Sequence, residues 1–406
     1  AEKVRRLDPQ TQDILQLAAC AGNRFDLETL CWIADLDPET AAAHLKPALA
    51  EGLVLPLGRT VFKFSHDRIQ QAVYSLIPEE QRERVHLKIG RRLQSRLAGN
   101  DDTSRIFEIA NQLNLGRGLL TSREEIIALA ELNLSAGIRA KQNSAFPTAL
   151  DYLGAGISLA EEGRDPWADH YDLSLALYSE ATEAAYLAGR FDQTDGWFRE
   201  VLAHGRTILD KVKPYETRIL AYKAENKLME AIDTGLELLE HLGERFPRNP
   251  NMAHIFRDLA TTHFALMGKS NEDLMALPLM TDPEKKAAMR IIADIMSSVY
   301  WGKPNLVPII AFRMVRLSLK YGNHPVSCFA YGSYGVLMCG VLGAMRTGYR
   351  YGHLALDLLE KLNAKEWKAQ IFVTPYALIF HWNEHVCNTL RPLQQSFQIG
   401  METGLI

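Results

Sequence analysis

The chain has 406 residues, of which 47% are hydrophobic and 23% are charged, a composition typical of a folded protein and too apolar for an intrinsically disordered one. Its formal net charge of -4 excludes a general electrostatic attraction to nucleic acid or to an anionic membrane. The five cysteines form no C-x-x-C pair, which indicates buried thiols in a reducing cytoplasm rather than disulfides or a zinc site.

The two ends of the sequence indicate a piece of a longer polypeptide. It begins with Ala1 instead of methionine, and its last residues break off within a helical pattern. No charged-then-apolar leader opens it, and charged residues interrupt its most apolar runs before they reach the length of a membrane span. We therefore expect a cytoplasmic segment that does not contact a membrane.

Three short helices are predicted near the start of the chain. The first covers residues 8–22, where Asp8 is the expected N-cap and Gly22 ends the helix. A second helix is predicted within residues 26–35. The third, within residues 37–52, starts with the same aspartate–proline pair as the first.

A β-hairpin is predicted directly after the third helix. Two short alternating runs lie on either side of residues 57–60, and Pro56 is tolerated on an edge strand. Three helices followed by a hairpin are typical of a winged helix-turn-helix. We therefore predict a winged-helix domain over residues 1–95.

The rest of the chain is predicted to be all-helical. Residues 140–153, 188–202 and 224–239 share a pattern in which a helix, a short polar turn and a second helix follow one another. The last two copies lie about 35 residues apart, close to the period of tetratricopeptide (TPR) helical hairpins. Such pairs bury their apolar faces only by stacking on their neighbours, which predicts a superhelical solenoid with a binding surface.

The predicted fold is therefore mainly α, with an N-terminal winged helix-turn-helix followed by a TPR-like α-α superhelical solenoid. We place TPR-like repeats over residues 96–245 and further helical repeats over residues 246–406.

The junction between the hairpin and the next helix carries the candidate functional residues. Ser65 is the expected cap of this helix, His66 its first residue, and Asp67 lies in the first turn, where the helix dipole favours a negative charge. Folding explains Ser65 and Asp67 but gives no reason for a histidine. An imidazole N–H beside the free backbone N–H groups of a helix start can bind an anion, so His66 is either a phosphate contact or a structural, solvated residue.

The stretch FKFSHDRIQQAVYSLIP, residues 62–78, resembles the winged-helix segment of signal-transduction ATPases with numerous domains, the STAND-type AAA ATPases. Together with residues 106–114, 186–219 and 224–243, it is similar to the ATPase-helical region of very large sensor proteins. Those proteins join a serine/threonine-kinase-like domain, this region, a GAF domain and a sensor histidine kinase of the two-component type. The likeness is specific in the first half of the chain and looser after about residue 300.

The resemblance implies a regulatory segment that couples the nucleotide state of a preceding ATPase domain to downstream signalling domains. It assigns His66 to the β-phosphate of bound ADP and Asp67 to a supporting role. ATP or ADP would be bound by the preceding domain, whose P-loop lysine, Walker B acid and sensor arginine are expected before residue 1, and this chain would hold no cofactor itself. The implied partners are that domain, the downstream GAF and histidine kinase domains, and a protein or peptide on the solenoid.

Two other functions remain as alternatives. The first alternative is a stand-alone TPR-like adaptor that binds peptides, and the second is a winged-helix transcription regulator that binds DNA. The DNA-reading helix would be the third one, which offers only His44 and Lys46 to bases and phosphates, so nucleic acid is not an expected partner. No Ser-His-Asp or Cys-His arrangement indicates an active site, and the kinase activity expected of the parent lies elsewhere.

Two further patterns have structural interpretations. His381 and His385 are four residues apart, with Glu384 between them, a spacing that can place two rings on one metal ion when the residues are helical. We expect a packing helix there and no metal site. The glycines at positions 332, 335, 340 and 343 predict close packing of helices rather than a phosphate-binding loop, because no P-loop motif is present.

Overall fold

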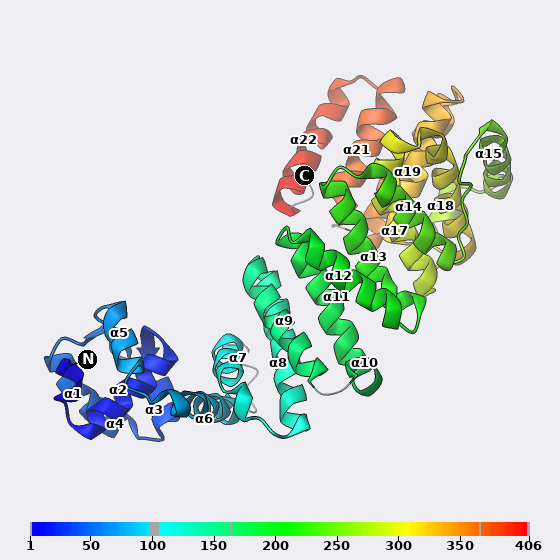
Figure 1. The fold of residues 1–406 in the computed structure, drawn as a ribbon. Coiled ribbons are helices and arrows are strands. Elements are labelled where there is room, and N and C mark those ends of the chain that lie inside the picture. Colours follow the sequence, from blue (N-terminus) through cyan, green and yellow to red (C-terminus); the bar gives the residue numbers. More distant parts are fainter. Residues whose placement is uncertain (1, 98–104, 163–164, 365–366, 404–406) are drawn as a thin grey trace. The chain divides into compact units, whose positions relative to one another are not determined.

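The computed structural model describes residues 2–97, 105–162, 165–364 and 367–403 (Figure 1). These residues are mainly α-helical, which confirms the predicted fold class. No helix within the described ranges combines the length and the apolarity that a bilayer span requires.

The chain forms two compact units, Ala1–Gly189 and Arg190–Ile406. The boundaries predicted at 95/96 and 245/246 both fall inside these units. The division into three domains therefore stays a prediction.

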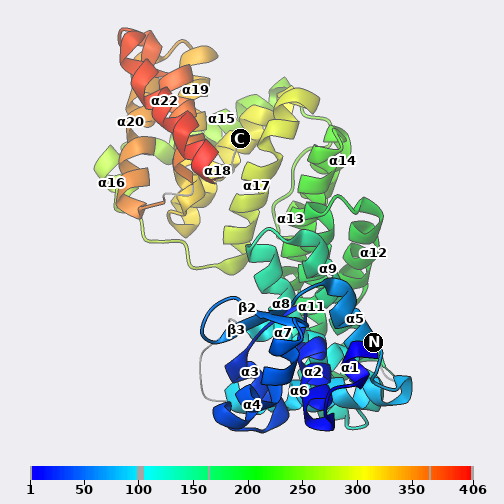
Figure 2. The same ribbon diagram turned by 90° about the vertical axis from the view of Figure 1, so that its left-hand side faces the viewer.

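The first part of unit 1 is a small helical module with a three-stranded sheet (Figure 2). The sheet is antiparallel in the order β1-β3-β2, and β2 and β3 form the predicted hairpin. The strand β1 was not predicted, because three residues are too few to show an alternating pattern. The elements are α1 (Glu2–Arg5), α2 (Pro9–Ala21), β1 (Arg24–Asp26), α3 (Leu27–Ala34), α4 (Pro38–Ala50), β2 (Val54–Pro56), β3 (Val61–Phe64) and α5 (Asp67–Tyr74).

The three predicted helices of this module are confirmed, and each begins with the same cap. An aspartate carboxylate accepts the backbone N–H of a threonine three residues later, and the threonine hydroxyl donates to the same carboxylate. Such a cap contributes about 1 kcal/mol of helix stability. The pairs are Asp8 with Thr11, Asp26 with Thr29, and Asp37 with Thr40.

The remainder of unit 1 is helical, with α8 and α9 packed against each other and α11 packed on α9. Lys141 of α8 forms ion pairs with Glu180 and Glu183 of α11, which adds a polar link to this packing. The elements are α6 (Glu79–Leu97), α7 (Ile106–Leu115), the 3-10 turn η2 (Arg117–Leu119), α8 (Arg123–Gln142), α9 (Phe146–Glu161), α10 (Pro166–Asp169) and α11 (Tyr171–Leu187).

The main apolar core of unit 2 runs from Val212 to Ile371, and a small cluster of Cys339, Ile379 and Phe380 is separate from it. Its helices pack in sequence, α13 on α14, α14 on α17, α17 on α18, α18 on α19 and α19 on α20. The elements are α12 (Phe191–His204), α13 (Ile208–Ala224), α14 (Leu228–His241), α15 (Met252–Leu266), α16 (Asn271–Met275), α17 (Pro283–Gly302), η3 (Pro304–Leu306), α18 (Val307–Tyr321), α19 (Pro325–Gly340), α20 (Met345–Leu362), α21 (Lys368–Leu378), η5 (Phe380–Trp382) and α22 (Cys387–Thr403).

The three predicted helix–turn–helix segments are present at the α8–α9, α11–α12 and α13–α14 turns. Each turn contains one residue in the left-handed region, namely Ser144, Gly189 and Asn226, with φ between 58° and 70°. A left-handed residue ends a helix and reverses the chain within a few residues. The polar turns seen in the sequence therefore have one shared backbone geometry.

The four glycines near position 340 divide into two groups. Gly332 and Gly335 lie in α19 where other helices come close: a Cβ at Gly335 would stand 2.9 Å from the backbone oxygen of Gly348 in α20. Close packing is confirmed for these two. The prediction was wrong for Gly340, which faces open space, and for Gly343, which has a φ of 64° in the turn after α19.

His324, the N-cap of α19, makes unit 2 sensitive to acid. Its Nδ1 accepts the backbone N–H of Val326 at 3.3 Å. Burial, and secondarily the charges of Arg290 and Lys286, lower its pKa from 6.5 to about 4. Between these two pH values His324 is protonated in the unfolded chain but not in the folded one. The free energy of unfolding should therefore fall as the pH drops from about 6.5 to about 4.

The substitution His324→Asn tests this contribution. Asparagine is a good N-cap but does not titrate, so the variant should lose less stability than the unaltered chain over the same pH window. Thermal unfolding of both chains at a series of pH values measures the difference. Parallel curves for the two chains would show that His324 contributes nothing to the acid sensitivity.

Candidate functional site

The junction of β3 and α5 is built on a buried aromatic cluster. Phe62 and Phe64 are buried, and their rings lie 6.0 Å and 5.6 Å from that of Phe25 in β1. The backbone N–H and the hydroxyl of Ser65 both donate to the backbone oxygen of Leu53, at 3.0 Å and 3.2 Å. These contacts fix the position of the backbone just before α5 begins.

His66, and not Ser65, caps α5, which corrects the sequence interpretation. The hydroxyl of Ser65 is occupied by Leu53. The Nδ1 atom of His66 instead accepts the backbone N–H of Arg68 at 3.1 Å, and the helix starts at Asp67. A histidine at this position thus has a structural role that the sequence did not reveal.

The cap also fixes which nitrogen of His66 carries the proton. Because Nδ1 accepts a hydrogen bond, the neutral ring is protonated on Nε2. The His66 side chain is exposed, as is that of Asp67. The ring therefore presents an N–H donor to the surface beside the N-terminus of α5, an arrangement that can bind an anion.

Asp67 and the rest of α5 are tied to the first part of the module. The Asp67 carboxylate accepts the side-chain amide of Asn23 at 2.8 Å. The side chain of Gln70 donates to the backbone oxygen of Ala19, at the end of α2, at 2.7 Å. Asp67 thus ties the start of α5 to the residue before β1.

A pair of cations lies on the sheet that leads into His66. Arg24 of β1 and Lys63 of β3 are register partners, so their side chains point to the same side of the sheet, opposite to the phenylalanines. Like charges directly opposite each other destabilise a sheet. Arg24 is exposed and Lys63 half-buried, and Arg68 of α5 adds a further exposed cation. Sequence reasoning missed this basic group because it depends on β1.

A buried series of hydrogen bonds, here called the Tyr74–His86–Gln112 chain, starts at the other end of α5. The hydroxyl of Tyr74 lies 2.9 Å from Nε2 of His86 in α6, whose Nδ1 lies 2.7 Å from the side-chain oxygen of Gln112 in α7. The amide nitrogen of Gln112 donates to the backbone oxygen of Cys20 in α2 at 2.8 Å. These partners could not be predicted from sequence, since every hydrogen bond of the series joins residues of different helices.

The proton positions in this chain follow from the outermost bond. Gln112 donates through its nitrogen, so its oxygen must accept from Nδ1 of His86, and Nε2 then accepts from the Tyr74 hydroxyl. His86 is 3% exposed, and burial raises the pKa of Tyr74. The hydrogen bonds of Tyr74, His86 and Gln112 thus form one buried polar link between α5, α6, α7 and α2.

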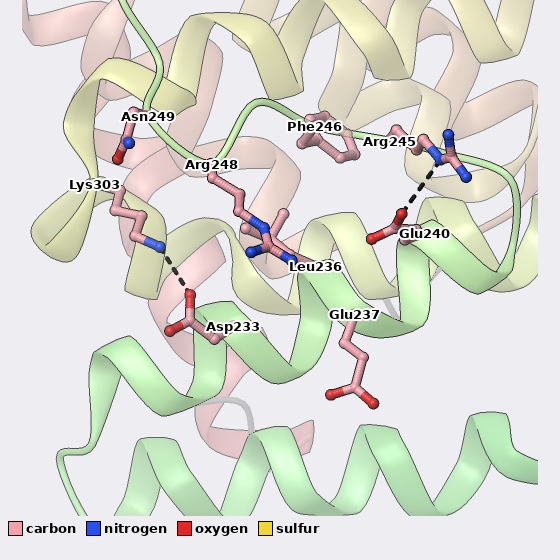
Figure 3. Close-up of a pocket in the computed structure, with 9 residues that line it drawn as sticks. All are labelled: Asp233, Leu236, Glu237, Glu240, Arg245, Phe246, Arg248, Asn249 and Lys303. Carbon is pink, nitrogen blue, oxygen red and sulfur yellow. Dashed lines mark hydrogen bonds and ion pairs between the residues drawn. The ribbon is translucent and has the colours of Figure 1, made fainter.

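A polar cavity of about 750 Å³ opens in unit 2 between α14, the α14–α15 connector and the end of α17 (Figure 3). Two ion pairs stand at its sides, Lys303 with Asp233 at 2.8 Å and Arg245 with Glu240 at 3.3 Å. Arg248 extends from the connector over Leu236 between them. With only Leu236 and Phe246 as apolar walls, the cavity suits a charged rather than an apolar group.

The histidine pair at residues 381 and 385 does not lie on one helix. His381 belongs to the short turn η5, and α22 starts only at Cys387, so the predicted helix is wrong there. Glu384 is engaged by the hydroxyl of Tyr349 at 2.5 Å. Within the described part of the chain, no three His, Cys, Asp or Glu side chains gather in a way that could hold a metal ion.

The helix considered for DNA reading is α4. Lys46 is exposed and His44 half-buried, and Asp37 and Glu39 stand at the start of the helix. These acidic groups would face a phosphate backbone that α4 approached with its N-terminus, which does not favour DNA binding.

Comparison with known proteins gives two distant similarities. The chain is 23% identical over 481 aligned positions to a hybrid signal transduction histidine kinase of Dictyostelium discoideum, an alignment that covers 99% of this chain and 14% of that protein. It also aligns, with a TM-score of 0.39 and 13% identity, with a STAND protein with a tetratricopeptide repeat sensor from Pyrococcus horikoshii, covering 99% of this chain and 58% of that one. No family model matches the sequence.

Proposed function

We propose that this chain is a regulatory segment of a multidomain signal-transduction ATPase and sensor kinase. In this proposal, residues 1–95 form a winged-helix domain that docks on a preceding nucleotide-binding domain, and the helical part passes the nucleotide state on to downstream GAF and histidine kinase domains. The curated relative, of which the chain spans 14%, bears the name of a signalling kinase, and this similarity supports the proposal.

The exposed Nε2–H of His66 is the observation that carries the proposal. The cap leaves this donor exposed next to the N-terminus of α5. Lys63 and Arg68 lie within three residues of His66 in sequence, and Arg24 is the register partner of Lys63. A diphosphate is the kind of ligand that such a surface attracts, because it accepts several charge-assisted hydrogen bonds. The β-phosphate of ADP held by the preceding domain would complete this site, with Asp67 keeping α5 in place.

The buried chain from Tyr74 through His86 to Gln112 supports a coupling role. A contact that shifts α5 at His66 would also shift Tyr74 at its other end, eight residues later. His86 and Gln112 would then have to change partners or move with it, because a buried polar group left without a partner costs about 1–3 kcal/mol. The phosphate signal would thus reach α6 and α7, the first helices beyond the module.

The substitution His66→Asn tests the phosphate contact in the full-length parent protein. Asparagine also caps a helix, so α5 should stay folded while the Nε2–H donor is lost. A hydrogen bond to a charged group contributes about 1.5–3 kcal/mol, so we expect ADP to bind roughly ten-fold more weakly or worse. Isothermal titration with ADP measures the change.

The matched control is His241→Asn, an exposed histidine on α14. It should leave ADP affinity unchanged. Circular dichroism should show both variants folded to the same extent. An ADP affinity that His66→Asn leaves unaltered would rule out His66 as the phosphate contact.

A further inference from the structure

Helix α15 carries apolar side chains on both of its sides. Its inner side packs on α18, with Leu266 buried and Ile255 and Leu259 half-buried (Figure 1). The opposite side, here called the outer face, spans about a third of the helix circumference. The outer face exposes Met252 at 59%, Phe256 at 59%, Phe264 at 67% and, just after the helix, Met267 at 68%.

These four side chains have the composition of a protein interface. Phenylalanine and methionine are enriched in the buried centres of interfaces, and methionine adapts its shape to a partner. A continuous exposed apolar face on a folded protein marks a surface that something else covers. The packing within unit 2 gives no other reason for them, because α15 is already held on α18 from its inner side.

The charges that residues 245–269 expose have a single sign, and the next exposed acids along the chain are Glu272 and Asp273 of α16. Residues 245–269 contain one acid, Asp258, which is 4% exposed and bound by Arg316 of α18. All the charged side chains that this segment exposes are cations, namely Arg245, Arg248, Arg257 and Lys269. The local surface is thus basic in a chain whose formal net charge is -4.

We propose that the outer face of α15 is the docking site of an acidic amphipathic helix from a protein partner. The apolar stripe of such a helix would cover Phe256 and Phe264, and glutamates or aspartates along its edges would meet Arg257 and Lys269. The 15 residues of α15 are about 22 Å long, which sets the length of the matching stripe at about four turns.

Two other occupants have to be compared with an acidic helix. In a symmetric dimer, the same patch meets its own copy, so the cations of residues 245–269 would face one another and repel. The same cations would attract an anionic bilayer, but the formal net charge of -4 of the whole chain opposes such attachment, and the vesicle measurement below tests this occupant. An acidic helix satisfies the apolar and the basic features together.

This inference rests on the proposed function only for the premise that the helical part docks a protein. It does not involve His66, and the ADP measurement does not involve α15. Failure of one experiment therefore leaves the other unaffected.

The probe is a fluorescein-labelled peptide of about 18 residues, with leucines at helical spacing on one side and glutamates along both edges. A second peptide has lysines in place of the glutamates. Fluorescence anisotropy with the full chain should show binding of the glutamate peptide and at least roughly ten-fold weaker binding of the lysine peptide. Binding should weaken as NaCl is raised from about 0.05 M to about 0.5 M.

Two variants locate the binding on α15. The double substitution Phe256→Ser with Phe264→Ser should weaken binding of the glutamate peptide at least about ten-fold, because it removes both aromatic anchors. The pair Arg257→Glu with Lys269→Glu should reverse the preference between the two peptides. Matched controls on other exposed positions of unit 2, Val341→Ser and Arg346→Glu, should leave both affinities unchanged.

Four outcomes would overturn the proposal. Equal binding of both peptides would show that the charges play no part, and equal binding to the double phenylalanine variant would place the site elsewhere. Binding to phosphatidylcholine–phosphatidylserine vesicles but to neither peptide would identify a membrane surface. Dimerisation that Phe256→Ser with Phe264→Ser abolishes, seen by analytical ultracentrifugation, would identify a second copy as the occupant.

Discussion

Replacement of Arg316 by methionine should lower the free energy of opening of α15 by about 3 kcal/mol, because it leaves a buried carboxylate without its counter-ion. The guanidinium bonds Asp258 at the side-chain oxygen (2.8 Å) and at the backbone oxygen (3.1 Å), and Thr262 at the hydroxyl (2.8 Å). The side chains of Arg316 and Asp258 are only 17% and 5% exposed. Burial also lowers the pKa of Arg316, so the pair is held together against a substantial desolvation cost.

Native-state hydrogen exchange reports this effect locally, which matters in a chain with two units. Peptides from α15 should exchange roughly 100-fold faster in Arg316→Met, and those from α20 much less so. The matched control is Arg245→Met, which removes an arginine that is 82% exposed from its ion pair with Glu240. Exposed pairs contribute about 0–1 kcal/mol, so a control that accelerated α15 as strongly would contradict the assignment.

Much of the fold could be predicted from sequence because its signals are local. The aspartates at positions 8 and 37 mark helix starts, because each accepts the backbone N–H of a threonine only three residues later. The hairpin turn and the polar turns between helices are equally local. The strand β1 escaped prediction because three residues acquire a strand conformation only by pairing with β3, which is 37 residues away.

The candidate site could be predicted in part. The motif around His66 pointed to the start of α5, where His66 lies exposed, because a histidine that begins a helix stands out against the residues that favour caps. The role of its two nitrogens could not be predicted, since it depends on Ser65 being turned away to bind Leu53. The Tyr74–His86–Gln112 chain and the outer face of α15 were also missed, because both are defined by which side of a helix other helices cover.

Gly348 in α20 is a position inside a helix where a single added methyl group should do severe local damage. A Cβ there would lie within van der Waals overlap of Cys339 Sγ and stand 2.6 Å from the backbone oxygen of Gly335, both in α19. A backbone oxygen inside a helix cannot move aside cheaply, so α19 and α20 would have to separate. Overpacking of this kind costs about 1–3 kcal/mol, and we expect Gly348→Ala to lie at the upper end.

Gly196→Ala is the matched control for Gly348→Ala, because Gly196 also lies within a helix of unit 2, α12, but has nothing within 4 Å of an added Cβ. Alanine there should stabilise α12 by about 0.5–1 kcal/mol through its higher helix propensity. The same propensity gain is available at Gly348, so the difference between the two variants isolates the steric cost of bringing α19 and α20 together. Hydrogen exchange should be faster in α19 and α20 for Gly348→Ala and slower in α12 for Gly196→Ala. If both substitutions stabilised the protein equally, α19 and α20 would not be close enough at Gly348 for an added methyl group to clash.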